Sequence, residues 1–514
     1  MQDYKNFSMA TKIEDAKTRR IYRLLEMLPG LFSWLTLLGA VFCSWLKPAW
    51  ASYFIITFVL YWLFRTLYFN IHLTTSFRKM RKNLEKDWLQ EIKDLSPEEA
   101  NYDWKELYQL VVVPMYKEPY EIVEEDFESL VNSKWPNDRM VVVLATEERA
   151  GEEAQRVAEK INQKYGDEFL RFKVTTHPDD IPGEVAGKGS NETWAGKKAK
   201  KIIDELEIPY EKVIMSSLDA DTTVPEYYFS CVAYNYLTVE NPTRNSYQPI
   251  ALFTNNIWEA PAFSRVFAFS STFWHTMNQE RPKKLVTFSS HSMPFKALVD
   301  VGFKPTDVVS DDSRIFWQCL FEYDGDYKVK PIYYPVRMDA NVASSIWETA
   351  VNIYKQQRRW AYGVGEIPYF LYGFTKNKKI PLMRKIRLCV ELLESHWSWA
   401  TSSLIIFMLG WLPLILGGPV FNQTILSYNL PRLTSRILTV AMIGLVGSAF
   451  TALILLPPRP PDYGRYKYLF MALEWVLLPI LMIFFTALPA LDAQTRWLFG
   501  KYMGFWPTKK VRKD

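Results

Sequence analysis

Three clusters of polar residues could together carry out a group transfer from a diphosphate. Asp219 and Asp221 follow one short apolar run, Asp311 and Asp312 follow another, and Gln356 to Trp360 reads QQRRW. Paired carboxylates can hold Mg²⁺ or Mn²⁺ beside phosphate oxygens, and another carboxylate can accept a proton. Arginine binds phosphate through two parallel hydrogen bonds, and a tryptophan ring can stack on a sugar. In this order, the clusters predict a metal-dependent transfer of a sugar.

Each acidic pair also has a plain structural interpretation. Asp219 and Asp221 occupy alternate positions just after a strand, so both can point into one site, but aspartates also stabilise turns. Asp311 and Asp312 precede a helical stretch, where a carboxylate at the amino end is favourable. The roles are compatible, because Asp311 can cap or orient while Asp312 reaches an acceptor hydroxyl. We therefore expect metal ligands at Asp219 and Asp221, and the general base at Asp312.

Short β-rich runs alternate with helical stretches through the polar middle of the chain. This alternation predicts an α/β layer with a largely parallel sheet. Ligands bind beyond the carboxyl ends of the strands in such a sheet, which is where Glu118, Glu147, Glu148 and Asp219 fall. The expected strands cover 110–113, 140–144, 172–175, 213–215 and 252–254, and the expected helices cover 120–133, 152–165 and 193–206.

Hydrophobic runs on both sides of this region are long enough to cross a bilayer, which takes roughly 20 residues. Basic residues lie before the first run and after the second, whereas the loop between them offers only Lys47. The positive-inside rule therefore places the amino terminus and the polar region in the cytoplasm. The runs cover 28–46, 48–64, 397–431, 437–458 and 468–491, and the last contains one acid, Glu474.

These boundaries predict an integral membrane protein, at the plasma membrane, with four parts. Residues 1–73 hold the amino-terminal segment and two transmembrane helices, and residues 74–345 form the cytoplasmic domain. Residues 346–396 form amphipathic interfacial helices carrying QQRRW, and residues 397–514 hold about three transmembrane helices and a basic tail. The net charge of +5 arises mostly at the membrane flanks, so the expected partner is the bilayer and not a nucleic acid. The four cysteines are scattered and predict neither a zinc site nor a disulfide framework.

The carboxyl-terminal region contains a conflict. Five crossings would place the basic tail, residues 509–513, opposite the cytoplasmic domain and against the charge rule. Pro489 could help break the last run into a re-entrant or surface helix instead, and an extra crossing elsewhere would also resolve the conflict. Since residues 468–491 are long enough to span, we expect five crossings.

The motif order resembles that of the processive-type family 2 glycosyltransferases, which include cellulose, chitin and hyaluronan synthases. Val111 to Glu118 is similar to the opening strand and Pro-x-Tyr-x-Glu turn of that family, and Lys188 to Asn191 to its K-x-x-N stretch. Asp219-Ala220-Asp221 resembles the D-x-D metal motif and Ser310-Asp311-Asp312 the T-E-D base motif. Gln356 to Trp360 matches Q-x-x-R-W, and the ending Trp506 to Lys509 resembles a W-G-T-R-like motif of some relatives.

The resemblance implies an α/β GT-A-type nucleotide-sugar-binding domain inserted between transmembrane α-helices. It implies inverting transfer from a nucleoside diphosphate sugar, with Asp312 as catalytic base beside Asp311 and Mg²⁺ or Mn²⁺ on Asp219 and Asp221. Arg359 would bind the diphosphate and Trp360 would stack on the acceptor sugar. The residues expected to contact substrates are Glu118, Glu147, Glu148, Lys188, Asp219, His291, Gln356, Arg358, Arg359 and Trp360.

The second strand departs from the family pattern. That family has adjacent aspartates there, which contact the base and ribose, whereas this chain has Glu147 and Glu148. A longer side chain changes the reach, so the nucleotide is left open. The segment 287–296 resembles the acceptor site without its glycine-rich form, and there Ser290, His291 and Ser292 could contact the acceptor.

Two alternatives remain open at this point. An apolar strand followed by Asp219-Ala220-Asp221-Thr222 also resembles the haloacid-dehalogenase phosphohydrolases, with Asp219 as nucleophile. The other alternative is a non-catalytic membrane scaffold or export partner with a degenerate transferase domain. Among transferases, the acceptor is a glycan or a lipid-linked molecule, and secretion or accessory subunits are possible partners. The QQRRW match with carboxyl-terminal membrane helices favours a β-linked polymer synthesised with export.

Overall fold

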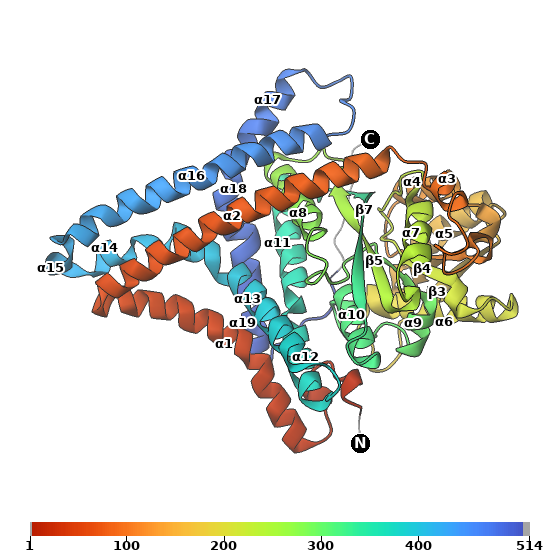
Figure 1. Cartoon of the computed structure of the whole chain (residues 1–514), viewed down its shortest axis with the longest axis horizontal. Coiled ribbons are helices and arrows are strands. Elements are labelled where there is room, and N and C mark those ends of the chain that lie inside the picture. Colours follow the sequence, from red (N-terminus) through yellow and green to blue (C-terminus); the bar gives the residue numbers. More distant parts are fainter. Residues whose placement is uncertain (1–2, 507–514) are drawn as a thin grey trace.

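Seven strands form one mixed sheet in the order β3-β2-β1-β4-β6-β5-β7. The computed structural model, which describes residues 3–506, joins this sheet domain to a bundle of long helices (Figure 1). β1, β2, β3 and β4 run parallel, and β6 is antiparallel to both β4 and β5. The strands are β1 Tyr108–Pro114, β2 Met140–Glu147, β3 Arg171–His177, β4 Val213–Ser217, β5 Asn245–Phe253, β6 Ser292–Pro294 and β7 Lys328–Met338.

The central strands are apolar because both of their faces are covered. β1 and β2 carry valine runs that are fully buried, as expected for parallel strands between layers of helices. Four of the five expected strands lie within β1, β2, β3 and β4, whereas the expected strand 252–254 covers only the end of β5, which begins at Asn245. β6 and β7 were not expected, and the antiparallel β6 makes the sheet mixed. The helices of this domain are α3 Trp88–Lys93, α4 Tyr120–Val131, α5 Glu152–Tyr165, α6 Lys188–Glu205, α7 Tyr228–Thr238, α8 Ala262–Asn278, α9 Phe295–Asp300 and α10 Asp311–Glu322.

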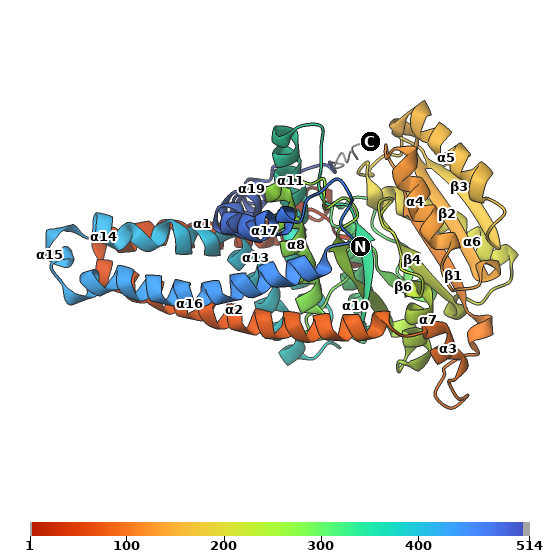
Figure 2. The same cartoon turned by 90° about the horizontal axis from the view of Figure 1, so that it is seen from above.

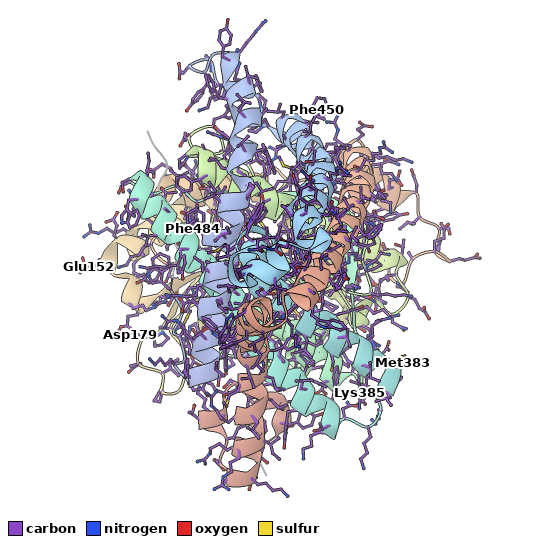
Figure 3. The ribbon with its side chains drawn as sticks, turned by 90° about the vertical axis from the view of Figure 1, so that its left-hand side faces the viewer. Glu152, Asp179, Met383, Lys385, Phe450 and Phe484 are labelled. Atoms are coloured by element: carbon purple, nitrogen blue, oxygen red, sulfur yellow. The ribbon has the colours of Figure 1, made fainter. Side chains whose placement is uncertain are left out.

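Long helices form a bundle that extends away from the sheet (Figures 1 and 2). Each has the length and composition to cross a membrane, and α13 does so together with the bent segment that follows it. Apolar side chains face outward along them, such as Phe450 on α16, 67% exposed, and Met383 on α13, 76% exposed (Figure 3). Such a surface is stable in lipid and not in water. These helices are α1 Ala16–Leu46, α2 Pro48–Leu84, α13 Leu382–Phe407 and α16 Ile425–Leu455.

The expected run 397–431 is not one straight helix. It comprises the end of α13, the short helices α14 Leu412–Leu416 and α15 Gly418–Asn422, and the start of α16. α13 and the segment after it differ in direction by 48°. The chain therefore turns at the far end of the bundle within this run.

The last apolar run lies across the base of the bundle and not along it (Figures 1 and 2). It comprises α17 Tyr466–Leu473, α18 Leu478–Met482 and α19 Leu488–Phe499. Glu474, its single acid, forms an ion pair of 2.7 Å with Arg265 of α8. α19 packs against α1, α13 and α11 Ile346–Ala361. By length and composition this run could span a membrane, but it is bound here to helices of the sheet domain.

After α19, residues 500–506 return to the sheet domain; we call them the terminal strap. Gly500 ends the helix with φ at +67°, a left-handed conformation that suits glycine. The Tyr502 hydroxyl donates to Glu26 at 2.7 Å, and the ring of Phe505 packs directly onto Gly187. The strap thus ends on the same side of the bundle as the sheet. The predicted basic tail and most of the Trp506 to Lys509 motif lie outside the described residues.

The amino-terminal segment, residues 3–12, is also fixed to the sheet domain. Lys5 forms an ion pair with Glu322 at the end of α10, and Lys12 forms one with Asp307. The Tyr369 hydroxyl, on α12 Glu366–Lys376, donates to the Lys5 carbonyl. The start of the chain and the strap therefore meet the same domain.

Candidate active site

The ammonium of Lys188 joins two of the predicted acidic clusters. Its Nζ lies 2.6 Å from Asp219 Oδ1 and 2.9 Å from Asp312 Oδ2. Lys188 is the first residue of α6, and Asn191 one turn later donates to the Ala145 carbonyl on β2, which fixes that helix to the carboxyl edge of the sheet. A single cation therefore neutralises the predicted metal ligand and the predicted base together.

A second lysine, Lys304, lies behind the first and is almost completely buried. Its Nζ lies 2.8 Å from Asp312 Oδ1 and 3.3 Å from Asp311 Oδ2, and it also pairs with Glu192. Glu192 in turn accepts a hydrogen bond of 2.6 Å from the Ser217 hydroxyl at the end of β4. Buried charges persist when they are paired in this way.

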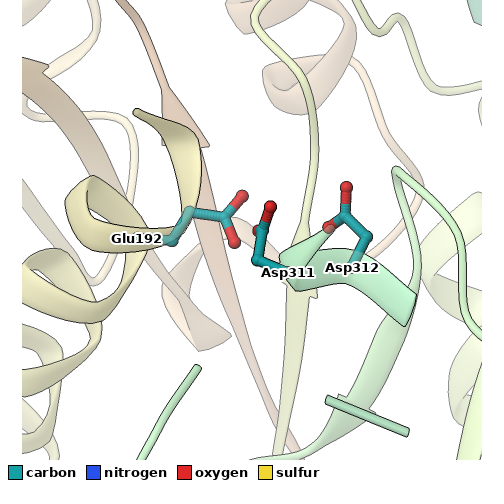
Figure 4. A group of neighbouring side chains, drawn as sticks. All are labelled: Glu192, Asp311 and Asp312. Carbon is teal, nitrogen blue, oxygen red and sulfur yellow. The ribbon is translucent and has the colours of Figure 1, made fainter. Parts of the chain in front are cut away.

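Three carboxylates meet at this point, from α6 and the start of α10 (Figure 4). The oxygens of Glu192, Asp311 and Asp312 lie within 4.8 Å of one another, the one group of this kind among residues 3–506 that could hold a metal. The group is tightly packed, because a Cβ added to Gly189 of α6 would lie 2.8 Å from Asp311 Cβ. The two lysines already balance most of its charge, so a metal here would have to displace an ammonium.

The two adjacent aspartates have opposite electrostatic environments. Burial and the neighbouring carboxylate of Asp312 raise the pKa of Asp311 above its ordinary value. Burial acts in the same direction on Asp312, but Lys188 and Lys304 outweigh it and hold the pKa of Asp312 well below its ordinary value. Asp312 is also the more open of the two, with 20% of its side chain exposed against 4% for Asp311. Asp312 is therefore the ionised and accessible member of the pair.

Asp219 and Asp221 lie beyond the end of β4, as the sequence predicts. Asp219 Oδ2 accepts a hydrogen bond of 2.5 Å from Ser289. Asp221 Oδ2 accepts one of 3.1 Å from the backbone of Asp339, next to the end of β7. The carboxylate oxygens of Asp219 and Asp221 are the kind of ligand that Mg²⁺ and Mn²⁺ prefer. In this structure the ammonium of Lys188 is the cation between Asp219 and Asp312.

The side chains of the QQRRW stretch on α11 diverge. Arg359 lies near the acidic group, whose charges act on its pKa, and its guanidinium stacks on Phe505 of the strap at 4.6 Å from the ring centroid. Arg358 points the other way, to an ion pair of 2.9 Å with Asp492 of α19. Trp360 packs near Phe253 at the end of β5. The two remaining members, Gln356 and Gln357, are buried.

The candidate residues at the ends of β1 and β2 form a second group. Glu118 closes the turn after β1 by accepting a hydrogen bond of 2.7 Å from the backbone of Tyr116. Glu147 is buried and pairs with Arg149. Glu148 is exposed and accepts from the backbone of Asp179 at 3.4 Å.

His291 and its neighbours are buried beneath the acidic group. His291 Nδ1 contacts the Phe288 carbonyl at 2.8 Å, and burial lowers its pKa to about 3, so the ring is neutral. Ser290 bonds to Thr222, and Ser292 bonds to Ser216 and Tyr228 within the sheet. This burial favours a supporting role for the three residues.

The structure therefore brings Lys188, Asp219, Asp311, Asp312 and Arg359 to one edge of the sheet. It directs Arg358 to Asp492 of α19 and keeps His291 below the surface of the site. No sequence motif indicated Lys304 or Glu192. Glu192 lies one turn after Lys188 on the same face of α6, a spacing that could have indicated it.

Residues 214–490, more than half of the chain, match the family described as Glycosyl transferase family group 2. The chain belongs to that family, and its mixed sheet between long apolar helices is of the GT-A type. The phosphohydrolase alternative is thereby set aside. No curated protein matches this chain in sequence.

Several solved structures resemble the fold at low identity. The mannosyltransferase PcManGT from Pyrobaculum calidifontis, in complex with GDP-Man and Mn²⁺, is 14% identical with a TM-score of 0.44, covering 87% of this chain and 100% of that one. TarS 1-349 from S. aureus, in complex with UDP-GlcNAc, is 11% identical with a TM-score of 0.35, covering 77% of this chain and 93% of that one. Neither likeness assigns a substrate to this chain.

Proposed function

We propose that this chain is an inverting glycosyltransferase that moves a sugar from a nucleoside diphosphate to a hydroxyl of a glycan or lipid-linked acceptor. The observation that carries the proposal is the position of Lys188, whose ammonium touches both Asp219 and Asp312. A donor diphosphate at this position would have a metal ligand on one side and a proton acceptor on the other.

In the proposed reaction, Asp312 takes the proton of the acceptor hydroxyl as its oxygen bonds to the anomeric carbon. The bond from that carbon to the diphosphate breaks, and an α-linked donor gives a β-linked product. Arg359 and Lys188 bind the departing diphosphate, and Mg²⁺ or Mn²⁺ on Asp219 and Asp221 would neutralise its charge when bound. Fixed charges of this kind act without reorganising during the reaction.

Lys188 would also adjust the base. While the Lys188 ammonium contacts Asp312, it lowers the pKa of the Asp312 carboxyl group, which makes that carboxylate a weak base. When it turns to the donor phosphates, Asp312 loses one of two compensating cations and becomes more basic. The base would thus gain strength only with donor in place, which limits wasteful hydrolysis.

We propose polymer synthesis coupled to export as the biological setting, as in the processive relatives, at the plasma membrane and with possible accessory or secretion subunits. Trp360 supports an acceptor site at the membrane side of the sheet domain, because it packs among residues that contact α2, α16 and the last apolar run. Its ring would stack on the acceptor sugar.

For topology we now propose four crossings, by α1, α2, α13 with its bent extension, and α16. The last apolar run would be a surface helix. Both the amino-terminal segment and the strap contact the sheet domain, so the number of crossings between that domain and the strap is even. This revises the expectation of five crossings and removes its conflict with the positive-inside rule, which places the sheet domain in the cytoplasm.

The proposed function is tested by nucleotide release from a panel of nucleoside diphosphate sugars, using the purified full chain in lipid discs with Mn²⁺. Release that depends on an added glycan or lipid-linked acceptor is expected. Binding of a donor without turnover in any acceptor would contradict it and support the scaffold alternative.

Replacing either metal ligand should weaken donor binding. Asp219→Asn and Asp221→Asn each remove a charged oxygen ligand, so we expect roughly 10-fold or weaker affinity for the nucleoside diphosphate and a blunted response to Mn²⁺. Calorimetric titration of the diphosphate with and without Mn²⁺ measures both effects. Full affinity in the presence of excess chelator would contradict the assignment.

Arg359→Ala and Trp360→Ala should separate donor binding from acceptor use. The guanidinium acts on phosphate and the indole on sugar, so Arg359→Ala should weaken diphosphate affinity and Trp360→Ala should raise the KM for acceptor. Arg358→Ala is the matched comparison, because that residue is held by Asp492. Equal diphosphate affinity in wild type and Arg359→Ala would be inconsistent with this division of roles.

A further inference from the structure

One carboxyl group in the interior of the sheet domain has no partner for its charge. Asp126 lies on the second turn of α4 and is fully buried, and within residues 3–506 neither of its side-chain oxygens has a hydrogen-bond partner. Its neighbours on the same face of the helix, Val123, Phe127 and Leu130, are apolar and also fully buried. A buried carboxyl group without a partner costs free energy. The position of Asp126 therefore needs an explanation other than packing.

The helix of Asp126 is fixed beside the loop that carries the proposed metal ligands. Almost one turn after Asp126, the Ser129 hydroxyl donates to the Asp126 carbonyl at 2.7 Å and accepts from the Val224 backbone at 3.0 Å. Ala220 and Val224 of the loop also belong to the same hydrophobic cluster as the buried face of α4. Asp126 therefore lies behind the segment that contains Asp221.

The charged groups that act on Asp126 are all acids. Burial raises the pKa of its carboxyl group well above the ordinary value, and Asp221, Glu125 and Asp219 raise it further. Charges interact strongly in the interior of a protein because the dielectric constant is low there. A divalent cation held by Asp219 and Asp221 would supply the positive charge that Asp126 lacks.

We infer that Asp126 is a positioning residue for the divalent cation of the donor, adding a third negative charge behind Asp219 and Asp221; the inference rests on the proposed function. The side chain of Asp126 is fully buried, so it acts on the cation through its charge and through Asp221. It strengthens cation binding, and it does so without contributing to the stability of the cation-free protein.

The inference predicts a loss of cation affinity without a loss of stability. Asp126→Asn keeps the shape of the side chain and removes its charge. It should bind Mn²⁺ roughly 10-fold more weakly, as is typical of residues that act on a metal through its ligands. Without metal, this variant should unfold at the temperature of wild type or above it, because no stabilising contact is lost.

Thermal unfolding of the full chain in lipid discs tests both parts, followed by tryptophan fluorescence over a series of Mn²⁺ concentrations and in excess EDTA. A cation that binds only the folded protein raises the unfolding temperature once its concentration exceeds the dissociation constant. Wild type should show this rise, and Asp126→Asn should need about 10-fold more Mn²⁺ for the same rise. The metal alone is the probe, so the result does not depend on the choice of donor nucleotide.

Glu128→Gln is the matched control on the same helix. Glu128 is exposed, so the loss of its charge should change neither the unfolding temperature in EDTA nor the response to Mn²⁺. Asp126→Leu repeats the test with an apolar side chain and should lose Mn²⁺ affinity as Asp126→Asn does. An equal loss of Mn²⁺ affinity in Glu128→Gln would show a general effect of charge on α4 and would overturn the inference.

The outcomes separate the inference from the proposed function. Equal responses to Mn²⁺ in wild type and Asp126→Asn overturn the inference and leave the transferase proposal standing. A much lower unfolding temperature of both Asp126 variants in EDTA would show that the carboxyl group stabilises the fold, which also overturns the inference. If Mn²⁺ has no effect on wild type, the metal site on Asp219 and Asp221 fails together with the inference, whereas acceptor-dependent nucleotide release decides the transferase proposal separately.

Discussion

Asp312→Asn is expected to lower the rate of sugar transfer by about 10²–10⁴, the usual contribution of a general base, while donor affinity changes little. The amide keeps the shape of the carboxylate but cannot take the acceptor proton. Asp312 is the candidate because it is ionised, partly exposed and in contact with the same ammonium as Asp219. Single-turnover transfer at saturating donor and acceptor measures the effect, with diphosphate titration as the measure of binding.

Asp311→Asn is the matched comparison at the neighbouring position. Asp311 is buried against Lys304 and has a raised pKa, so its loss should affect stability more than the transfer rate. Activity of Asp312→Asn within a few-fold of wild type would remove Asp312 from the base role. A larger rate loss in Asp311→Asn than in Asp312→Asn would exchange the two assignments.

Lys304→Met should destabilise the protein by about 3–5 kcal/mol, the cost of removing one partner from a buried ion pair. The side chain of Lys304 is 2% exposed and contacts three carboxylates. Without it, the carboxylates of Glu192 and Asp312 would each lose their nearest cation. Unfolding in detergent, followed by tryptophan fluorescence during a urea titration, measures the loss.

Two further variants identify the cause of that loss. Lys296→Met removes a lysine whose side chain is 35% exposed and pairs only with Asp300 among the described residues, and it should change stability by less than about 1 kcal/mol. The double variant Lys304→Met with Glu192→Gln should recover part of the stability, because it removes one of the uncompensated charges. Unchanged stability in Lys304→Met would show that the buried carboxylates are already protonated.

The sheet was largely predictable from sequence because its central strands are simple. Short valine runs such as those of β1 and β2 are typical of buried parallel strands. Both strands begin and end within a few residues of the positions expected from the sequence. β7 was missed because its prolines and lysines break the apolar pattern, and β6 because three residues are too few to form one. Both depend on neighbours from distant parts of the chain.

The site was predictable as far as motifs mark its residues. The acidic pairs and Arg359 lie together as their order in the sequence suggests. Lys304 carries no such mark, since a single lysine in a loop is usually solvated, and only the fold brings it to Asp312. Arg358 shows the converse: it adjoins Arg359 in sequence, but helix geometry turns it by about 100°, towards Asp492. The spacing of residues within a motif therefore does not identify the side chain that each of them contacts.

The contacts of the amino-terminal segment have a consequence for the order of assembly. The Ser8 hydroxyl donates a hydrogen bond to Asp307, 299 residues later, and the Lys5 carbonyl accepts one from Tyr369, 364 residues later. At a synthesis rate of about 5–20 residues per second, the first of these partners emerges about 15–60 s after the segment. During that interval α1 can already insert into the bilayer, while the amino-terminal segment remains at the bilayer surface without its partners. The amino-terminal segment therefore docks in the last stage of folding, when α10 and α12 have formed. Its contacts would mark the completion of the sheet domain.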